Sequence, residues 1–540
     1  MKALPLFEDL AAFYNGHNAV AERVEKSKLQ SMHIGTGLDM AIETWIRQKF
    51  DVILTGNPGD GKTHLISILQ DRGSLSSAYV EKDASQKDAE SILQMWQQKK
   101  QENVPCVFAI NHAPLRNLAT KAQLYSNLEY LTNLPDAVDN CIYYNEVPNS
   151  KLSRTIVVDL SQRETVTTTT IKGLVEKLCK PVILAPCNDC PPRKCPVEYN
   201  AEALLNDKIR RNLVTILTLL ARRGFHTTMR DLIGLIAFIL TGDKPCATRW
   251  QPIKNEDGSF STPTFEDYVY YNLLFKGRSS LFDAIRTTFD PVNYSDSDSD
   301  GKLWSGAIHD GWLMPERVVI QPGSLEELRI LKRRYFFEHQ HDTVELLRRM
   351  LPITEYDFGT LIEGELDDPS EVENLVGMIN NLYAPMHSHQ GTDQRSYRLR
   401  LWNSHRYSVG NRPGYFAMRS IPADNLTIYR PKATPQIADA MEVRQDHVLL
   451  AVRDWIAGDP GLRIDWPMYQ ALTSAHYGTP IEVQPFHILR RLDLFLRSLG
   501  PEGGGSRHIE NIEWSNHQYR TLVSIRVNRT NQCYEQERHA

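Results

Sequence analysis

Across the first 200 residues, short runs of consecutive apolar residues alternate with longer stretches in which apolar residues recur every three or four positions. The apolar runs at residues 52–55, 78–80, 106–110 and 155–160 have the length and composition of buried strands. Strands that are apolar along most of their length and alternate with helices predict a parallel sheet covered on both faces. Helices are expected at residues 34–50, 86–101, 115–134 and 170–179.

Residues 56–63 read Gly-Asn-Pro-Gly-Asp-Gly-Lys-Thr and lie between the first of these strands and an apolar-periodic stretch. G-x-x-x-x-G-K-T in that setting is the P-loop motif, whose glycines let successive backbone N–H groups turn toward phosphate oxygens. Lys62 is expected to reach the β- and γ-phosphates of ATP, and the Thr63 hydroxyl to complete the shell of a Mg²⁺ ion. The residues predicted to bind ATP are Gly56, Asn57, Pro58, Gly59, Asp60, Gly61, Lys62, Thr63 and His64.

Hydrolysis also needs an acidic residue on the metal ion and a group that orients the attacking water. Asp83 and Asp159 each follow a strand, whereas the run at 106–110 is followed by Asn111-His112 in place of a carboxylate. A buried strand that ends in Asn is also an ordinary turn signal. The sequence therefore indicates nucleotide binding more firmly than fast turnover. The predicted catalytic residues are Lys62, Asp83, Asn111 and Arg230.

Two helices are expected after the sheet, at residues 202–223 and 229–241, ended by Gly224 and Gly242. In this position they resemble the lid that closes over the nucleotide in AAA+-type ATPases. Arg230 begins the second helix, where the helix dipole disfavours a cation, so a phosphate-sensing role is predicted. The Arg222-Arg223 pair lies at the C-terminal end of the first helix. The favourable interaction of cations with the helix dipole at this end is enough to explain its position. Arg163 could act across a subunit boundary as an arginine finger.

A proline-rich segment contains Cys187, Cys190 and Cys195, with Cys179 upstream. Its prolines, Pro181 among them, are expected to keep it out of regular structure. Four thiolates suit tetrahedral Zn²⁺ or an iron–sulfur cluster, and the alternative is a set of free buried cysteines. We expect a structural metal site here.

The second half of the chain has a less regular pattern. Residues 395–430 are expected to be β-rich, and helices are expected at 443–457, 464–476 and 485–499, followed by strands around 518–527. Arginines and aromatic residues alternate across 395–419, which allows nucleic-acid contact but favours a half-buried strand with a solvated face. The expected divisions are a helical lead-in (1–50), an ATPase core (51–200) with a cysteine-rich loop (179–195), a helical lid (201–245), a mixed accessory domain (246–440) and a C-terminal α+β domain (441–540).

Composition narrows the class further. The chain has 540 residues, of which 41% are hydrophobic and 24% charged, as is ordinary for a globular protein. The net charge of −5 supplies no global basic field, so contact with nucleic acid would be local. The longest apolar runs are about half the length of a membrane span, and the N-terminus lacks a signal-peptide pattern. A cytoplasmic protein without membrane contact is expected.

Several segments together resemble one family, the ATPases of bacterial DNA phosphorothioation-dependent restriction systems of the DptF type. The segments that carry the likeness are TGNPGDGKTHLI (55–66), KDAS (82–85), FAINHAPL (108–115), CNDCPPRKCPVEYN (187–200), HTTMRDLIGLIAFILTGD (226–243) and YYNLLF (270–275), followed by Asp290-Pro291. The likeness covers about the first 300 residues. It departs at 111–113, where Asn-His-Ala stands in place of Asn-Glu-Gly.

The resemblance implies an ATP-driven subunit of an anti-phage defence complex, which works with partner proteins on invading DNA and can assemble as a homo-oligomer. No nuclease constellation is evident in the sequence, so DNA cleavage would belong to a partner. The alternatives are a low-turnover, nucleotide-gated scaffold and a STAND-type signalling ATPase that does not act on DNA.

Overall fold

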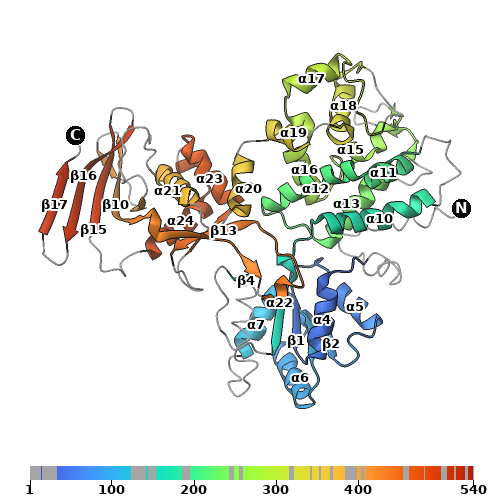
Figure 1. Cartoon of the computed structure of the whole chain (residues 1–540), viewed down its shortest axis with the longest axis horizontal. Coiled ribbons are helices and arrows are strands. Elements are labelled where there is room, and N and C mark those ends of the chain that lie inside the picture. Colours follow the sequence, from blue (N-terminus) through green and yellow to red (C-terminus); the bar gives the residue numbers. More distant parts are fainter. Residues whose placement is uncertain are drawn as a thin grey trace.

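The computed structural model describes about three quarters of the chain. The described residues are 14, 33–122, 142–143, 154–184, 195–242, 249–254, 260–314, 321–340, 343–351, 354–364, 369–383, 398–402, 407–409, 412–433, 435–453, 461–479, 481–499, 507–515, 518–528 and 533–538. They form an α/β unit, a helical unit and a C-terminal α+β unit, which lie at the bottom, the upper right and the left of Figure 1.

The α/β unit contains a parallel sheet in the order β2-β3-β1-β5. Its strands are β1 (Asp51–Thr55), β2 (Tyr79–Glu81), β3 (Cys106–Ala109) and β5 (Thr155–Asp159). Helices α4 (Gly37–Arg47), α5 (Lys62–Asp71), α6 (Ala89–Gln101) and α7 (His112–Ala122) flank it. The expected parallel sheet with helices around it is confirmed.

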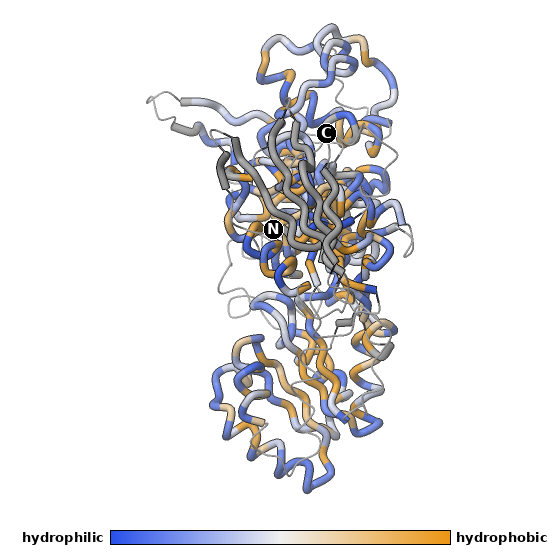
Figure 2. The backbone as a smooth tube through the Cα atoms, turned by 90° about the vertical axis from the view of Figure 1, so that its left-hand side faces the viewer, coloured by the Kyte–Doolittle hydropathy of each residue, from blue (hydrophilic) through white to orange (hydrophobic). Residues whose placement is uncertain are grey.

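The side chains of β1 alternate between two hydrophobic clusters, one on each face of the sheet. Val52 and Leu54 pack in the cluster that contains α4 and α5, and Ile53 packs in the cluster that contains α6 and α7. In Figure 2 the strands of this unit are coloured as hydrophobic, while the surrounding helices carry hydrophilic stretches. Burial of both faces thus explains why these strands have continuous apolar sequences.

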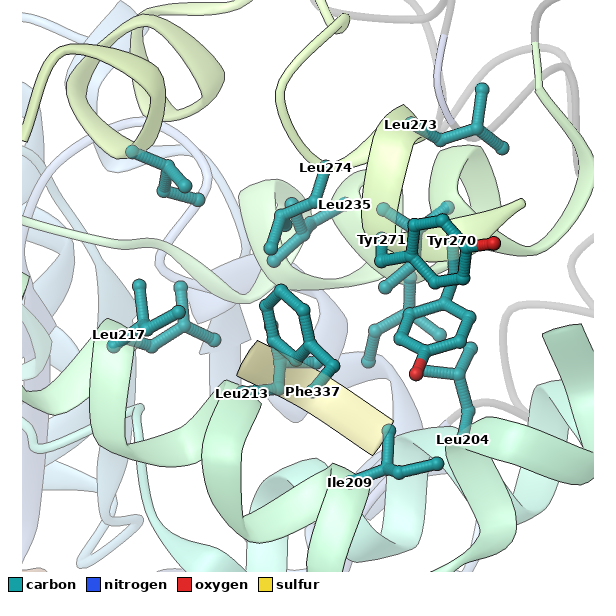
Figure 3. Close-up of a cluster of buried hydrophobic side chains, with 14 of the residues drawn as sticks. Leu204, Ile209, Leu213, Leu217, Leu235, Tyr270, Tyr271, Leu273, Leu274 and Phe337 are labelled. Atoms are coloured by element: carbon teal, nitrogen blue, oxygen red, sulfur yellow. The ribbon is translucent and has the colours of Figure 1, made fainter. Parts of the chain in front are cut away.

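The main hydrophobic core of the helical unit extends from Val166 to Leu351 and therefore includes residues on both sides of position 245. Figure 3 shows part of this core, with Leu213, Leu235, Leu274 and Phe337 among the labelled side chains. Its helices are α10 (Thr168–Leu184), α11 (Pro196–Leu205), α12 (Asp207–Arg222), α13 (Met229–Thr241), α15 (Tyr270–Leu273), α16 (Ser280–Phe289), α17 (Ser297–Trp304), α18 (Leu325–Glu338) and α19 (Thr343–Met350).

Two predictions for this unit are wrong: a single helix at 202–223, and the absence of regular structure around Pro181. The single helix expected at 202–223 is divided at Asn206, whose side chain caps α12 by accepting from the N–H groups of Lys208 and Ile209 at 2.9 and 3.4 Å. Pro181 lies inside α10, which continues to Leu184. The proline therefore removes one hydrogen bond near the end of the helix without ending it there.

The C-terminal unit combines helices with two antiparallel sheets. One sheet has the order β11-β13-β14, and the other has the order β17-β16-β15-β10-β8 with β9 paired to β10. The strands of the two sheets are β8 (Arg398–Trp402), β9 (Tyr407–Val409), β10 (Arg412–Pro422), β11 (Leu426–Tyr429), β13 (His447–Val452), β14 (Gly461–Asp465), β15 (Arg507–Ser515), β16 (Gln518–Asn528) and β17 (Cys533–Arg538). The helices are α20 (Thr354–Glu363), α21 (Pro369–Tyr383), α23 (Trp466–His476) and α24 (Phe486–Ser498).

The β-rich prediction for 395–430 is confirmed where the structure describes it, but the helix predicted at 443–457 is wrong. Residues 447–452 form β13, the central strand of its sheet. A solvated face is also wrong at Arg400, which is only 8% exposed and whose backbone N–H donates to Asn380 Oδ1. Arg395 and Arg406 lie outside the described residues.

A segment of the C-terminal region, residues 432–446, crosses back onto the α/β unit and is called the crossing segment below. Its strand β12 (Lys432–Ala433) pairs with β4 (Ile142–Tyr143), and α22 (Pro435–Ala438) follows. Ile437 and Met441 pack in the same cluster as α4 and β1. Figure 1 shows α22, in orange, beside the blue elements of the α/β unit. Residues from the last third of the chain therefore form part of the hydrophobic core of the α/β unit, which is built mainly from the first third.

No helix in the described part of the chain is long and apolar enough to cross a membrane.

Candidate functional site

A cavity of about 570 Å³ lies at the carboxyl ends of the parallel strands, where the first turn of α13 covers them. Open α/β sheets bind ligands at this edge because the loops after adjacent strands converge there. The residues that line it are His33, Ile34, Thr36, Asp39, Pro58, Gly59, Asp60, Gly61, Lys62, Thr63, His64, Leu65, Lys82, Asp83, Ser85, Ala109, Asn111, Leu160, Arg163, Met229, Arg230 and Ile233. Gly56 and Asn57, also predicted to bind ATP, contribute backbone carbonyls to Lys62 instead.

The glycine-rich loop, residues 56–63, is wound around the carboxylate of Asp60. Gly56, Gly59 and Gly61 have φ of 138°, 100° and 93°, which side chains with a Cβ rarely adopt. Asp60 Oδ2 accepts from the N–H of Asn57 at 2.6 Å, and a Cβ on Gly56 would lie 2.7 Å from the same oxygen. The loop leads directly into α5, whose first N–H groups have no acceptor within the helix. This end of α5 can therefore bind an anion.

Lys62 is buried at the base of the cavity with no carboxylate hydrogen-bonded to it among the described residues. Its Nζ donates to the carbonyls of Gly56 and Asn57, both at 2.9 Å. Burial lowers the pKa of Lys62, and the nearby carboxylates of Asp60, Asp159 and Asp83 oppose that shift. A partly desolvated ammonium held only by carbonyls is well suited to an anionic ligand.

Asp83 and Asp159, the two candidate acids, are in different surroundings. Thr63 Oγ1 donates to the backbone carbonyl of Lys82 at 3.3 Å, which brings the hydroxyl beside Asp83, and Asp83 lines the cavity. Asp159 Oδ1 accepts from the N–H and Oγ of Ser161 at 2.9 and 2.7 Å and contacts His112 Nε2 at 3.0 Å. Of the two carboxylates, Asp83 therefore lines the cavity beside the Thr63 hydroxyl, whereas Asp159 holds a turn.

Asn111 lines the cavity, and its N–H donates to Ser85 Oγ at 2.8 Å. His112 is not among the lining residues, because its ring is turned toward Asp159. Of the residues that directly follow β3, Asn111 therefore brings its amide to the cavity. The imidazole of His112 does not line the cavity, and no carboxylate stands at this position.

Two arginines reach the cavity, and one of them was expected elsewhere. Arg163 lines its own chain's cavity, and no other described residue forms a hydrogen bond or ion pair with its guanidinium. Burial lowers the pKa of Arg163, with Asp39 and Asp60 opposing. Arg230 lines the cavity from the first turn of α13.

The Arg222-Arg223 pair, by contrast, faces other elements. Arg222 pairs with Glu363, and Arg223 lies over the ring of Trp466 at 5.0 Å. Both therefore join the helical unit to the C-terminal unit.

The cavity lining also includes three apolar side chains on or near α4 and α13, and two histidines. Ile34 lies before α4, and Met229 and Ile233 lie on α13. His33 Nε2 contacts Asp39 Oδ2 at 2.6 Å, and its ring lies 5.4 Å from that of His64. Burial and the neighbouring His33 lower the pKa of His64. The sequence singled out only His64 here, because nothing local shows that the lead-in to α4 returns to the loop.

The cysteine prediction lies partly outside the described residues. Cys187 and Cys190 are not described, Cys195 precedes α11, and Cys179 is buried in the core of the helical unit. Burial raises the pKa of the Cys179 thiol to about 12, which disfavours the thiolate. Within the described ranges, no three His, Cys, Asp or Glu side chains are grouped to hold a metal ion.

Comparisons with protein-family models, with curated proteins and with solved structures found no match to this chain.

Proposed function

We propose that the chain binds a nucleoside triphosphate, with ATP as the expected nucleotide, together with Mg²⁺, and hydrolyses it as a P-loop ATPase. The observation that carries this proposal is the pair of mostly buried cations, Lys62 and Arg163, beside the glycine-rich loop at the start of α5. Burying a charge without a counter-ion is costly, so the cavity favours a polyanion. A triphosphate supplies that charge.

Three groups of residues would hold the phosphates, the Mg²⁺ ion and the base, respectively. The loop, Lys62 and Arg163 would hold the phosphates, with Arg230 approaching from α13. Thr63 and Asp83 would hold Mg²⁺, which neutralises charge that develops on the phosphate oxygens. The apolar lining residues Ile34, Met229 and Ile233 would take the planar base, with His64, whose pKa is lowered by burial, in the same cavity lining.

Asn111 is the only side chain at the end of β3 that lines the cavity and can orient a water molecule. An amide polarises a water molecule by hydrogen bonding but accepts no proton from it at neutral pH. This favours slow hydrolysis, and it keeps the low-turnover scaffold as the second candidate. In either case the nucleotide site is the same.

The segments shared with restriction-system ATPases support a place for this ATPase in a multi-protein anti-phage defence complex. Direct contact with DNA is tested by titrating the chain with duplex DNA at two salt concentrations. Binding through phosphate contacts would weaken steeply as salt rises. Absence of binding at both salt concentrations would assign any DNA contact to the partner proteins.

The hydrolysis proposal is tested by measuring phosphate release and nucleotide affinity for the wild type, Lys62→Ala and Asp83→Asn. Lys62→Ala is expected to weaken MgATP binding about 100-fold or more, and Asp83→Asn to lower kcat by a similar factor. Lys87→Ala is the matched control, because it removes a lysine charge whose partner is Glu81 and which does not line the cavity. Equal phosphate release from the wild type and Lys62→Ala, with ATP bound by the wild type, would favour the scaffold.

A further inference from the structure

A chain of polar contacts connects the glycine-rich loop, the helical unit and the crossing segment. Asp60 Oδ1 contacts His226 Nε2 at 2.7 Å, and His226 Nδ1 contacts Arg444 Nη1 at 3.1 Å. Arg444 Nη2 in turn lies 2.9 Å from Asp446 Oδ2, next to the first residue of β13. Asp60 comes from the loop after β1, His226 from the turn before α13, and Arg444 from the crossing segment.

The chemistry of the three groups fixes the direction of each hydrogen bond. Arginine has only donors, so His226 Nδ1 must accept from Arg444. The proton of the neutral imidazole then lies on Nε2 and is donated to Asp60. The other oxygen of Asp60 accepts from the N–H of Asn57 in the loop. Arg444 therefore determines which tautomer of His226 holds the carboxylate that shapes the loop.

This chain of contacts is shielded from water along most of its length. The side chains of Asp60, Asp446 and Arg444 are 1%, 5% and 13% exposed, and that of His226 is 22% exposed. Hydrogen bonds to charged groups in such surroundings are stronger than those on the surface.

The crossing segment is also joined to the loop that carries Arg163. Arg163 and Val443 form an antiparallel bridge, Arg444 N–H donates to Gln162 O, and Glu164 N–H donates to Glu442 O, both at 2.8 Å. The same few residues of the crossing segment thus contact both His226 and the loop that carries Arg163.

We propose that Arg444 is a positioning residue of the nucleotide site, which orients His226 and Asp60 and transmits nucleotide occupancy to the C-terminal unit through the crossing segment. The coupling to nucleotide rests on the proposed function, but the effect of Arg444 on the loop does not. Movement of the loop or of α13 on nucleotide binding would change the contacts of Arg444, and with them the attachment of β13.

The test compares Arg444→Met, Arg444→Lys and the matched control Arg463→Met in the full chain. Arg463 also faces Asp446, at 3.5 Å, but it is half exposed and has no contact with His226. Amide hydrogen exchange of residues 56–63 is measured without nucleotide, and the affinity for MgATP is measured separately. Arg444→Met is expected to speed exchange and weaken MgATP binding, each about tenfold, with partial recovery in Arg444→Lys and little change in Arg463→Met.

Equal exchange of residues 56–63 in Arg444→Met and Arg463→Met would overturn the inference. If the wild type binds no MgATP, the proposed function fails, while the exchange experiment still decides the role of Arg444. If Arg444→Met does not fold, the pair His226→Gln and His226→Leu replaces it. A glutamine amide can both donate to Asp60 and accept from Arg444, so only His226→Leu should speed exchange. Equal exchange in these two variants would contradict the proposal.

Discussion

Lys62 and Arg163 each bring a positive charge into partly buried surroundings without a carboxylate at ion-pair distance in the described structure. Burial lowers the pKa of both groups. A lysine whose pKa is lower in the folded than in the unfolded state disfavours folding while it is charged. That penalty is present in full below the folded-state pKa, shrinks as the pH rises through that value, and is gone above the unfolded value. Phosphate binding would remove it.

Replacing Lys62 by methionine should therefore leave the nucleotide-free protein as stable as the wild type, or raise its free energy of unfolding by about 1 kcal/mol. MgATP at 100 times its Kd should stabilise the wild type by about 2.7 kcal/mol, and this gain should be absent in Lys62→Met. Thermal unfolding with and without MgATP measures both quantities at pH 7. A large loss of stability in the nucleotide-free variant would mean that Lys62 serves the fold instead of a ligand.

At the scale of single residues, the sequence predicted the loop side of the cavity and Arg230, but neither His33 in the lining nor the contact of His226 with the loop. Lys62, Thr63 and Asp83 could be chosen because a contiguous motif and strand ends mark them. His33 and His226 have no such mark, since their roles depend on contacts with Asp39 and Asp60 that only the folded chain brings together.

At the scale of elements, α13 is placed against the loop by a close contact at Gly59. A Cβ on Gly59 would lie 3.2 Å from Thr228 Oγ1, and Gly59 has φ of 100°. Thr228 caps α13 by accepting from the N–H of Asp231 at 3.2 Å, while Asp231 accepts from the Thr228 hydroxyl. The contact between the glycine-rich loop and α13 therefore depends both on the absence of a side chain at Gly59 and on the capping residue Thr228.

Gly59→Ala is expected to lower the free energy of unfolding by about 2 kcal/mol, because it combines backbone strain with crowding of Thr228. It should also weaken MgATP binding. Gly73→Ala is the control, because Gly73 also has a positive φ, 77°, but has open space where a Cβ would lie. Its free energy of unfolding should therefore fall only by the cost of backbone strain, about 1 kcal/mol. Urea unfolding of the two variants measures the difference. Equal losses in both would contradict the close contact.

Some elements could be predicted from the sequence, and others could not. The parallel strands were recognised because continuous apolar runs alternate with helical periodicity. The strand at residues 447–452 was mistaken for a helix, because a short apolar run has no distinctive period. The division at Asn206 was missed because the apolar pattern continues across it, whereas the side-chain cap that starts α12 is a local contact.

At the scale of the whole molecule, the C-terminal third of the chain helps to build the first. The crossing segment packs Ile437 and Met441 into the core under α4, and it pairs with the loop that carries Arg163. Such pairing between distant segments leaves no periodic signal in the sequence. The unit that we propose to bind nucleotide is therefore larger than the segment that carries the motif.

The most direct test of the nucleotide-binding claim is isothermal titration calorimetry of the intact chain with ATP in the presence of Mg²⁺. We predict a binding heat with one site per chain for the wild type, and its loss in Lys62→Ala with the fold retained. The absence of any binding heat from folded wild-type protein with ATP up to about 1 mM, the upper end of ordinary KM values, would contradict the account.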